Sequence, residues 1–239
     1  MINKTKHVFL CGIAVSLLFS TIGFPPPAQG LKTKSVTDSY QGVAAIPGSV
    51  YAQPPDPTGG YYNASENGMD YDEFVWDDFT FSADQTITEI HWRGAYDPSR
   101  ATYHQPLGYF TVAIYPSIAG GFQPDVAHLP SVEYQASGNA GETPAGTFGG
   151  VVMYDYAYVL PTAFPATGGV KYWIYLEAFQ AGVPDWCIAK GTGGNGTHFH
   201  GFINYAGGTS YDYRTGDTAF ELLGPVTATN KIFLPFVAR

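Results

Sequence analysis

The chain has 239 residues and a formal net charge of −9, with 13% charged and 16% aromatic residues, 29 glycines and 18 prolines. This acidic balance argues against a protein that binds nucleic acid or an anionic membrane surface. Low charge, many aromatic residues and frequent turn formers are typical of short strands joined by turns, and they are not typical of helices.

The first 30 residues have the layout of a secretory signal peptide. The basic stretch "MINKTKH" precedes the apolar run "VFLCGIAVSLLFSTIGF", and small residues suited to cleavage follow in "PPPAQG". The apolar run is at the lower limit for a membrane span, so a retained N-terminal anchor is the alternative. We expect residues 1–30 to be removed, which leaves a mature chain without a membrane span that is secreted or held at the cell surface.

Residues 31–70 show no steady hydrophobic period. They contain "IPGSVYAQPPDPTGGYYNASENG", which is dense in proline, glycine, asparagine and serine. This composition predicts a linker or an irregular N-terminal arm.

Strand patterns recur through residues 71–225. Alternating segments such as "TEIHWRG", "YFTVAIYP", "GGVVMYDYAYVLP", "GGVKYWIYLEAF" and "DTAFELLG" are separated by turn clusters, and no stretch has a convincing helical period. The pattern predicts one all-β domain, a two-sheet antiparallel β-sandwich with a jelly-roll-like order, with a closed barrel as second choice. Residues 226–239, which include "NKIFLPFVAR", are interpreted either as a sorting or attachment signal or as a final edge strand.

Five short blocks occur in a fixed order along this region. They are Asp77-Asp78-Phe79, Trp92-x-Gly94-x-Tyr96, Phe110 with Ile114-Tyr115, Tyr172-Trp173, and Gly216-Asp217-x-Ala219-Phe220. In this order, over roughly residues 73–224, the chain resembles an uncharacterised bacterial exported β-sandwich domain of cell-surface proteins. The resemblance implies a fold and a location rather than an activity. The segment "DWCIAKGTGGNGTHFHG" departs from the family pattern because it carries a histidine pair.

Two aromatic residues and two histidines are the predicted ligand-binding residues. Trp173 and Tyr175 alternate with Ile174 and Leu176, which places the two pairs on opposite faces of a strand. His198 and His200 share a face, which points outward if Phe199 and Ile203 point to the core. Exposed aromatic rings with polar neighbours can stack on sugar rings. The alternative is that both faces of this sheet are covered and Trp173 belongs to the core.

Two kinds of metal site are also considered. Histidines at alternate strand positions lie roughly 6.5–7 Å apart at Cα, close enough to share a metal ion. A zinc ion needs further ligands, and no spacing selects them. Asp78 and Asp217 would come together if the first and last strands lie side by side, and their oxygen atoms suit Ca²⁺. The alternative for these carboxylates is solvated turn and capping positions.

Catalytic motifs are missing from the sequence. It contains no G-x-S-x-G, no H-E-x-x-H and no phosphate loop, and nothing pairs two carboxylates as a glycosidase requires. The favoured hypothesis is therefore an exported non-catalytic module that binds carbohydrate or another cell-surface ligand through an aromatic face. The alternatives are a structural cell-surface protein without a small ligand and a metal-dependent or glycan-acting enzyme.

Overall fold

The computed structural model describes residues 47–67, 72–97, 107–180, 185–204 and 208–226. The predicted signal peptide, residues 1–30, lies outside the described residues, as does the C-terminal tail from residue 227 onward. In the part of the chain that is described, no helix is long and apolar enough to cross a membrane.

The described residues form strands and no helix. The strands are β1 (Ser49–Gln53), β2 (Tyr61–Ala64), β3 (Glu66–Asn67), β4 (Asp72–Thr80), β5 (Gln85–Tyr96), β6 (Tyr109–Pro116), β7 (Val132–Ser137), β8 (Thr143–Phe148), β9 (Val151–Ala166), β10 (Lys171–Phe179), β11 (Trp186–Gly191), β12 (Thr197–Asn204), β13 (Gly208–Thr215), β14 (Asp217–Thr218) and β15 (Phe220–Leu223).

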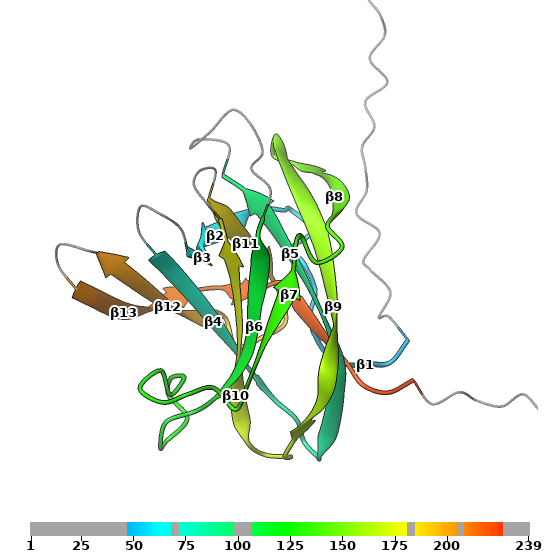
Figure 1. The fold of residues 1–239 in the computed structure, drawn as a ribbon, viewed down its shortest axis with the longest axis vertical. Helices are drawn as coiled ribbons and strands as arrows, with labels where there is room; N and C mark the ends of the chain where they lie inside the picture. Colours follow the sequence, from blue (N-terminus) through cyan, green and yellow to red (C-terminus); the bar gives the residue numbers. More distant parts are fainter. Residues whose placement is uncertain (1–46, 68–71, 98–106, 181–184, 205–207, 227–239) are drawn as a thin grey trace, which may run out of the picture. The chain divides into compact units, whose positions relative to one another are not determined.

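These strands build two sheets that pack on one another (Figure 1). The seven-stranded sheet has the order β13-β12-β4-β3-β10-β6-β7. The eight-stranded sheet has the order β1-β15-β5-β11-β14, with β2 beside β11, and β9 between β5 and β8. The pairings are antiparallel except for β3 with β10. The predicted all-β two-sheet sandwich is therefore confirmed.

The main core lies between the two sheets and follows the predicted alternation. On β6 the core-facing residues are Phe110, Val112 and Ile114, all fully buried. Strand β5 contributes Ile90 and Trp92 from the opposite sheet. Burial of apolar side chains at every second position on both sheets drives the sheets together.

The prediction of an irregular arm is wrong for residues 49–67. Strand β1 pairs with β15, β2 pairs with β11, and β3 pairs with β10. These strands are two to five residues long and are interrupted by proline and glycine, so they show almost no period of their own. They form strands because the rest of the domain supplies their partners, which are β15 for β1, β11 for β2, and both β4 and β10 for β3.

The seven-stranded sheet is apolar on both faces. A second buried cluster consists of Trp76, Ala113, Trp173, Tyr175 and Phe199. On β10, Trp173 and Tyr175 alternate with Ile174 and Leu176, which belong to the main core. The second cluster therefore lies on the outer side of this sheet, away from the eight-stranded sheet.

Candidate functional site

Trp173 and Tyr175 are on the predicted outer side of β10 but are not exposed. Only 2% of the surface of Trp173 and 6% of that of Tyr175 is accessible. The indole Nε1 of Trp173 donates a hydrogen bond to Ser117 Oγ at 2.8 Å. The expectation that these two rings are freely exposed is wrong, because aromatic side chains on the neighbouring strands cover them.

The histidine pair points the opposite way from the prediction. Both side chains share one face, as expected, but His198 and His200 are buried while Phe199 joins the outer cluster. The His198 ring lies 4.5 Å from that of Tyr62 on β2, measured between centroids. The inference about direction is wrong because Phe199 packs into an apolar layer on the outer side, not into the main core.

Each buried histidine has polar partners on its own side of the sheet. His198 Nδ1 donates to the carbonyl oxygen of Gly216 at 2.7 Å, and burial lowers the pKa of His198 below its ordinary value of 6.5. His200 lies between two carboxylates, with Nε2 at 3.1 Å from Glu73 and Nδ1 at 3.1 Å from Asp212. Within the described ranges, no group of three or more His, Cys, Asp or Glu side chains is placed to hold a metal ion.

The outer aromatic face is a row of rings that crosses the seven-stranded sheet. Trp76 stacks on Tyr175 with centroids 5.0 Å apart and an interplanar angle of 26°. Phe199 stacks on Tyr211 at 5.8 Å and 6°. We define the outer aromatic face by the side chains of Phe74, Trp76, Tyr115, Trp173, Tyr175, Phe199, Tyr211 and Tyr213.

This face is buried in its middle and open at its β13 end. Tyr211 and Tyr213 are 46% and 49% exposed. Gly201 leaves the space for this arrangement, because a Cβ at that position would lie 2.9 Å from the Tyr211 ring and 3.2 Å from that of Trp76. The result is two half-exposed tyrosine rings whose inner edges rest on a fixed aromatic base.

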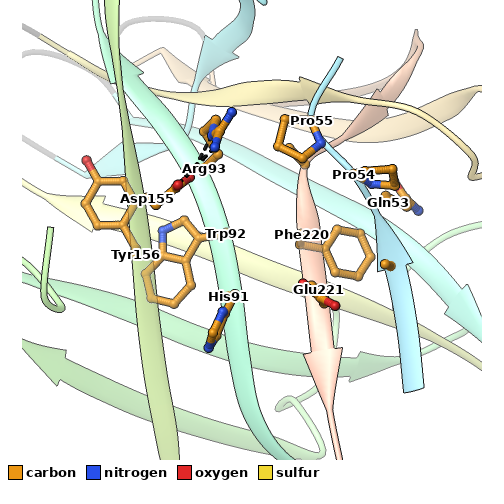
Figure 2. A pocket seen from close by; sticks show the side chains of 12 residues that line it. Gln53, Pro54, Pro55, His91, Trp92, Arg93, Asp155, Tyr156, Phe220 and Glu221 are labelled. Atoms are coloured by element: carbon orange, nitrogen blue, oxygen red, sulfur yellow. Dashed lines mark hydrogen bonds and ion pairs between the residues drawn. The ribbon is translucent and has the colours of Figure 1, made fainter. Parts of the chain in front are cut away.

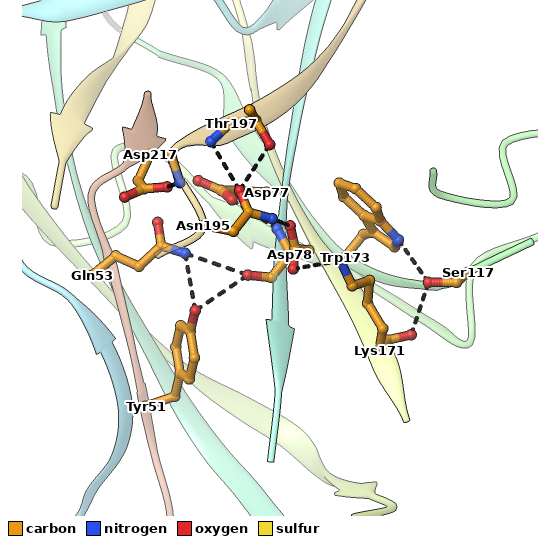
Figure 3. A network of polar contacts seen from close by, with 11 residues as sticks. Tyr51, Gln53, Asp77, Asp78, Ser117, Lys171, Trp173, Asn195, Thr197 and Asp217 are labelled. Carbon is orange, nitrogen blue, oxygen red and sulfur yellow. Dashed lines mark hydrogen bonds and ion pairs between the residues drawn. The ribbon is translucent and has the colours of Figure 1, made fainter. Parts of the chain in front are cut away.

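A polar cluster of Asp78, Lys171 and Asn195 lies beside Trp173 at the border of this face (Figure 3). Asp78 lies opposite Trp173 in the strand register and pairs with Lys171 Nζ at 3.0 Å. Asn195 donates its side-chain amide to Asp78, and its Oδ1 accepts hydrogen bonds from the backbone and hydroxyl of Thr197, each at 2.8 Å. Desolvation and the Asp78 charge raise the pKa of Tyr213, which places this cluster within electrostatic reach of the exposed ring.

Asp78 and Asp217 both contact the 192–196 turn, but they lie on β4 and β14, which belong to different sheets and do not pair as the prediction required. Asp217 accepts from the backbone N–H groups of Gly194 and Gly196 at 2.9 and 2.6 Å. Asp78 accepts from Lys171 and Asn195. These donors stabilise the 192–196 turn against β4 and β14, and the calcium hypothesis stays a prediction.

Two further carboxyl groups are buried beside these elements. Asp77 accepts hydrogen bonds from the backbone and hydroxyl of Thr218 at 2.6 and 2.9 Å, and burial raises its pKa to about 8. Glu177 follows Tyr175 on the outer side of β10. Burial, reinforced by the charges of Asp72 and Glu133, raises its pKa to about 7.

A groove of about 280 Å³ lies on the eight-stranded sheet, where β1, β15, β5 and β9 run side by side (Figure 2). Pro54 and Pro55 line one part of it. The Arg93 guanidinium donates to both oxygen atoms of Asp155 at 2.6 and 2.9 Å. His91 Nε2 lies 2.6 Å from Oε1 of Glu89, two residues before it on β5. Its volume is below that of most drug-sized pockets, which are about 300–1,000 Å³.

Tyr211 and Tyr213 were not among the predicted ligand-binding residues, although the sequence alternation around them indicates a half-exposed strand. Tyr211 and Tyr213 alternate with Asp212 and Arg214, as in a half-exposed strand. The glycines before them make this stretch look like a turn cluster, which hides the alternation.

Fold and site together define an all-β sandwich with a two-sided seven-stranded sheet. Residues 49–194 match the profile of a family described as Domain of unknown function (DUF7901), and the chain belongs to this family. It matches no curated protein and no solved structure.

Proposed function

We propose that this protein is an exported, non-catalytic β-sandwich module that binds carbohydrate at the β13 end of its outer aromatic face. The observation that carries the proposal is the pair of half-exposed rings, Tyr211 and Tyr213, held beside a fixed polar cluster. Sugars present apolar ring faces and many hydroxyl groups, so a flat aromatic surface with polar groups at its rim suits them.

The rigidity of this site favours binding. The Tyr211 ring is stacked on Phe199, and Phe199 contacts Trp76 at 6.0 Å between centroids. Rings that are already held in place lose little conformational entropy when a ligand covers them. Lys171 is likewise held by its ion pair with Asp78, so the rim presents a partly exposed ammonium donor in a fixed position, while Asp78 itself is buried.

The buried residues Trp173 and Tyr175 take an indirect part in this proposal. They form the base under the exposed rings and do not touch the ligand. His198 and His200 face the other side of the sheet and contribute to stability. The alternative hypothesis, a structural cell-surface protein without a small ligand, predicts no binding to any glycan.

A glycan array and an insoluble-polysaccharide pull-down test the proposal with the purified protein. We expect Tyr213→Ala and Tyr211→Ala to lose most binding, since stacking on one ring contributes strongly to such contacts. Tyr158→Ala is the matched control because Tyr158 is a partly exposed tyrosine on β9, in the other sheet.

Circular dichroism must show that all three variants keep the wild-type fold. Absence of binding by the folded wild-type protein would refute the carbohydrate function and favour the structural alternative. Equal loss in the Tyr158 variant would refute the location of the site.

A further inference from the structure

Strand β13 is a fully exposed sheet edge. It forms one end of the seven-stranded sheet, and among the described strands it pairs only with β12 (Figure 1). All eight of its residues, Gly208–Thr215, are exposed. Such an edge carries backbone donors and acceptors that can pair with another strand.

The charges on this edge are self-complementary. Asp212 and Arg214 are the charged residues of β13, and Tyr213 lies between them. If two copies of β13 pair antiparallel with a two-fold axis at Tyr213, Asp212 of each copy lies opposite Arg214 of the other. Opposite charges directly across two strands are stabilising, and a two-fold axis produces the contact twice.

The same alignment also pairs the uncharged residues favourably. Tyr213 lies opposite itself, and Tyr211 lies opposite Thr215. Aromatic–aromatic and aromatic–β-branched pairs are both favourable across antiparallel strands. An axis at Asp212 or at Arg214 would instead place like charges opposite each other, so the charge pattern selects one alignment.

We infer that two copies of this chain associate through β13 in that alignment. The two charged groups are held in place, because Arg214 Nε lies 3.0 Å from Asp212 Oδ2 and His200 holds the same carboxylate at 3.1 Å. Pairing joins the two seven-stranded sheets, so the outer aromatic faces of the two copies become continuous at Tyr213. The contact spans the five residues from Tyr211 to Thr215, and an interface this small forms a weak dimer.

Analytical ultracentrifugation over a range of concentrations tests the inference, with charge-reversal variants of the full chain. Asp212→Arg places arginine opposite arginine in a homodimer, and Arg214→Asp places aspartate opposite aspartate. We expect each variant alone to dimerise about tenfold or more weakly than wild type. An equimolar mixture of the two variants restores opposite charges between chains only, because each chain still carries like charges within itself. We therefore expect the mixture to recover dimers.

The control is the double variant Asp212→Asn/Arg214→Gln, which removes both charges from one chain. Mixed with either reversal variant it should show no recovery, because no opposite charges then face each other across the interface. A wild-type protein that stays monomeric at its highest soluble concentration overturns the inference, whatever the variants do. Dimers that persist unchanged in both reversal variants overturn it too, because they place the interface elsewhere. Glycan binding plays no part in these measurements, so they are independent of the proposed function.

Discussion

Replacing Glu177 by glutamine should change how the stability of the protein depends on pH. Burial raises the pKa of Glu177 from its ordinary value of 4.5 to about 7, so the folded protein holds this proton where the unfolded chain has released it. The wild-type protein therefore loses stability as pH rises from about 4.5 to about 7, because the native state binds more protons than the unfolded state. Glutamine resembles the protonated acid and cannot ionise.

The size of the effect follows from the difference between the two pKa values. At roughly 1.4 kcal/mol for each tenfold change in proton affinity, the change from 4.5 to about 7 amounts to about 3 kcal/mol. We expect Glu177→Gln to raise the free energy of unfolding by up to about 3 kcal/mol more at about pH 8 than at about pH 4. This value applies to Glu177 because the side chain is buried on the outer side of β10.

Urea unfolding followed by tryptophan fluorescence measures this difference. Glu221→Gln is the control, since Glu221 is a partly exposed glutamate on β15 in the other sheet, and its replacement should have a much smaller pH-dependent effect. If the stability difference between Glu177→Gln and wild type were the same at about pH 4 and at about pH 8, the reasoning from burial would be refuted.

Three further predictions concern the same sheet. Trp173→Ala should reduce the free energy of unfolding by about 3–5 kcal/mol in urea titrations, because the indole is buried; a loss under about 1 kcal/mol would contradict that burial. His198 has a lowered pKa, so the unfolded chain binds the proton first and wild-type stability should fall as pH drops below 6.5. In the His198→Asn variant, the melting temperature should fall less steeply as the pH drops below 6.5. The same slope as in wild type would contradict the assignment of this effect to His198. Gly201→Ala should cost about 1–3 kcal/mol and displace the Tyr211 ring, which near-ultraviolet circular dichroism can follow.

The alternation in the sequence was enough to predict the sandwich and the two faces of β10. Ile174 and Leu176 face the main core, and Trp173 and Tyr175 face away from it, as the period of two requires. Alternation of this kind can be recognised in the sequence because each residue of a long strand must place its side chain on one of two faces.

Periodicity alone could not decide which face of β12 lies inside. His198 and His200 alternate with Phe199, and the usual rule would turn the phenylalanine toward the core. In this sheet both sides are buried, so the rule does not apply, and the histidines occupy the side where Gly216, Glu73 and Asp212 offer partners.

The sequence by itself determined the all-β class, the main strands and the opposite directions of neighbouring side chains. Only the tertiary structure decided that β1 to β3 are strands, that Trp173 is covered, and that Tyr211 and Tyr213 are the exposed rings. The physical reason is that alternation is a local property of one strand. Burial depends instead on which strands become neighbours and on what lies against each face of the sheet.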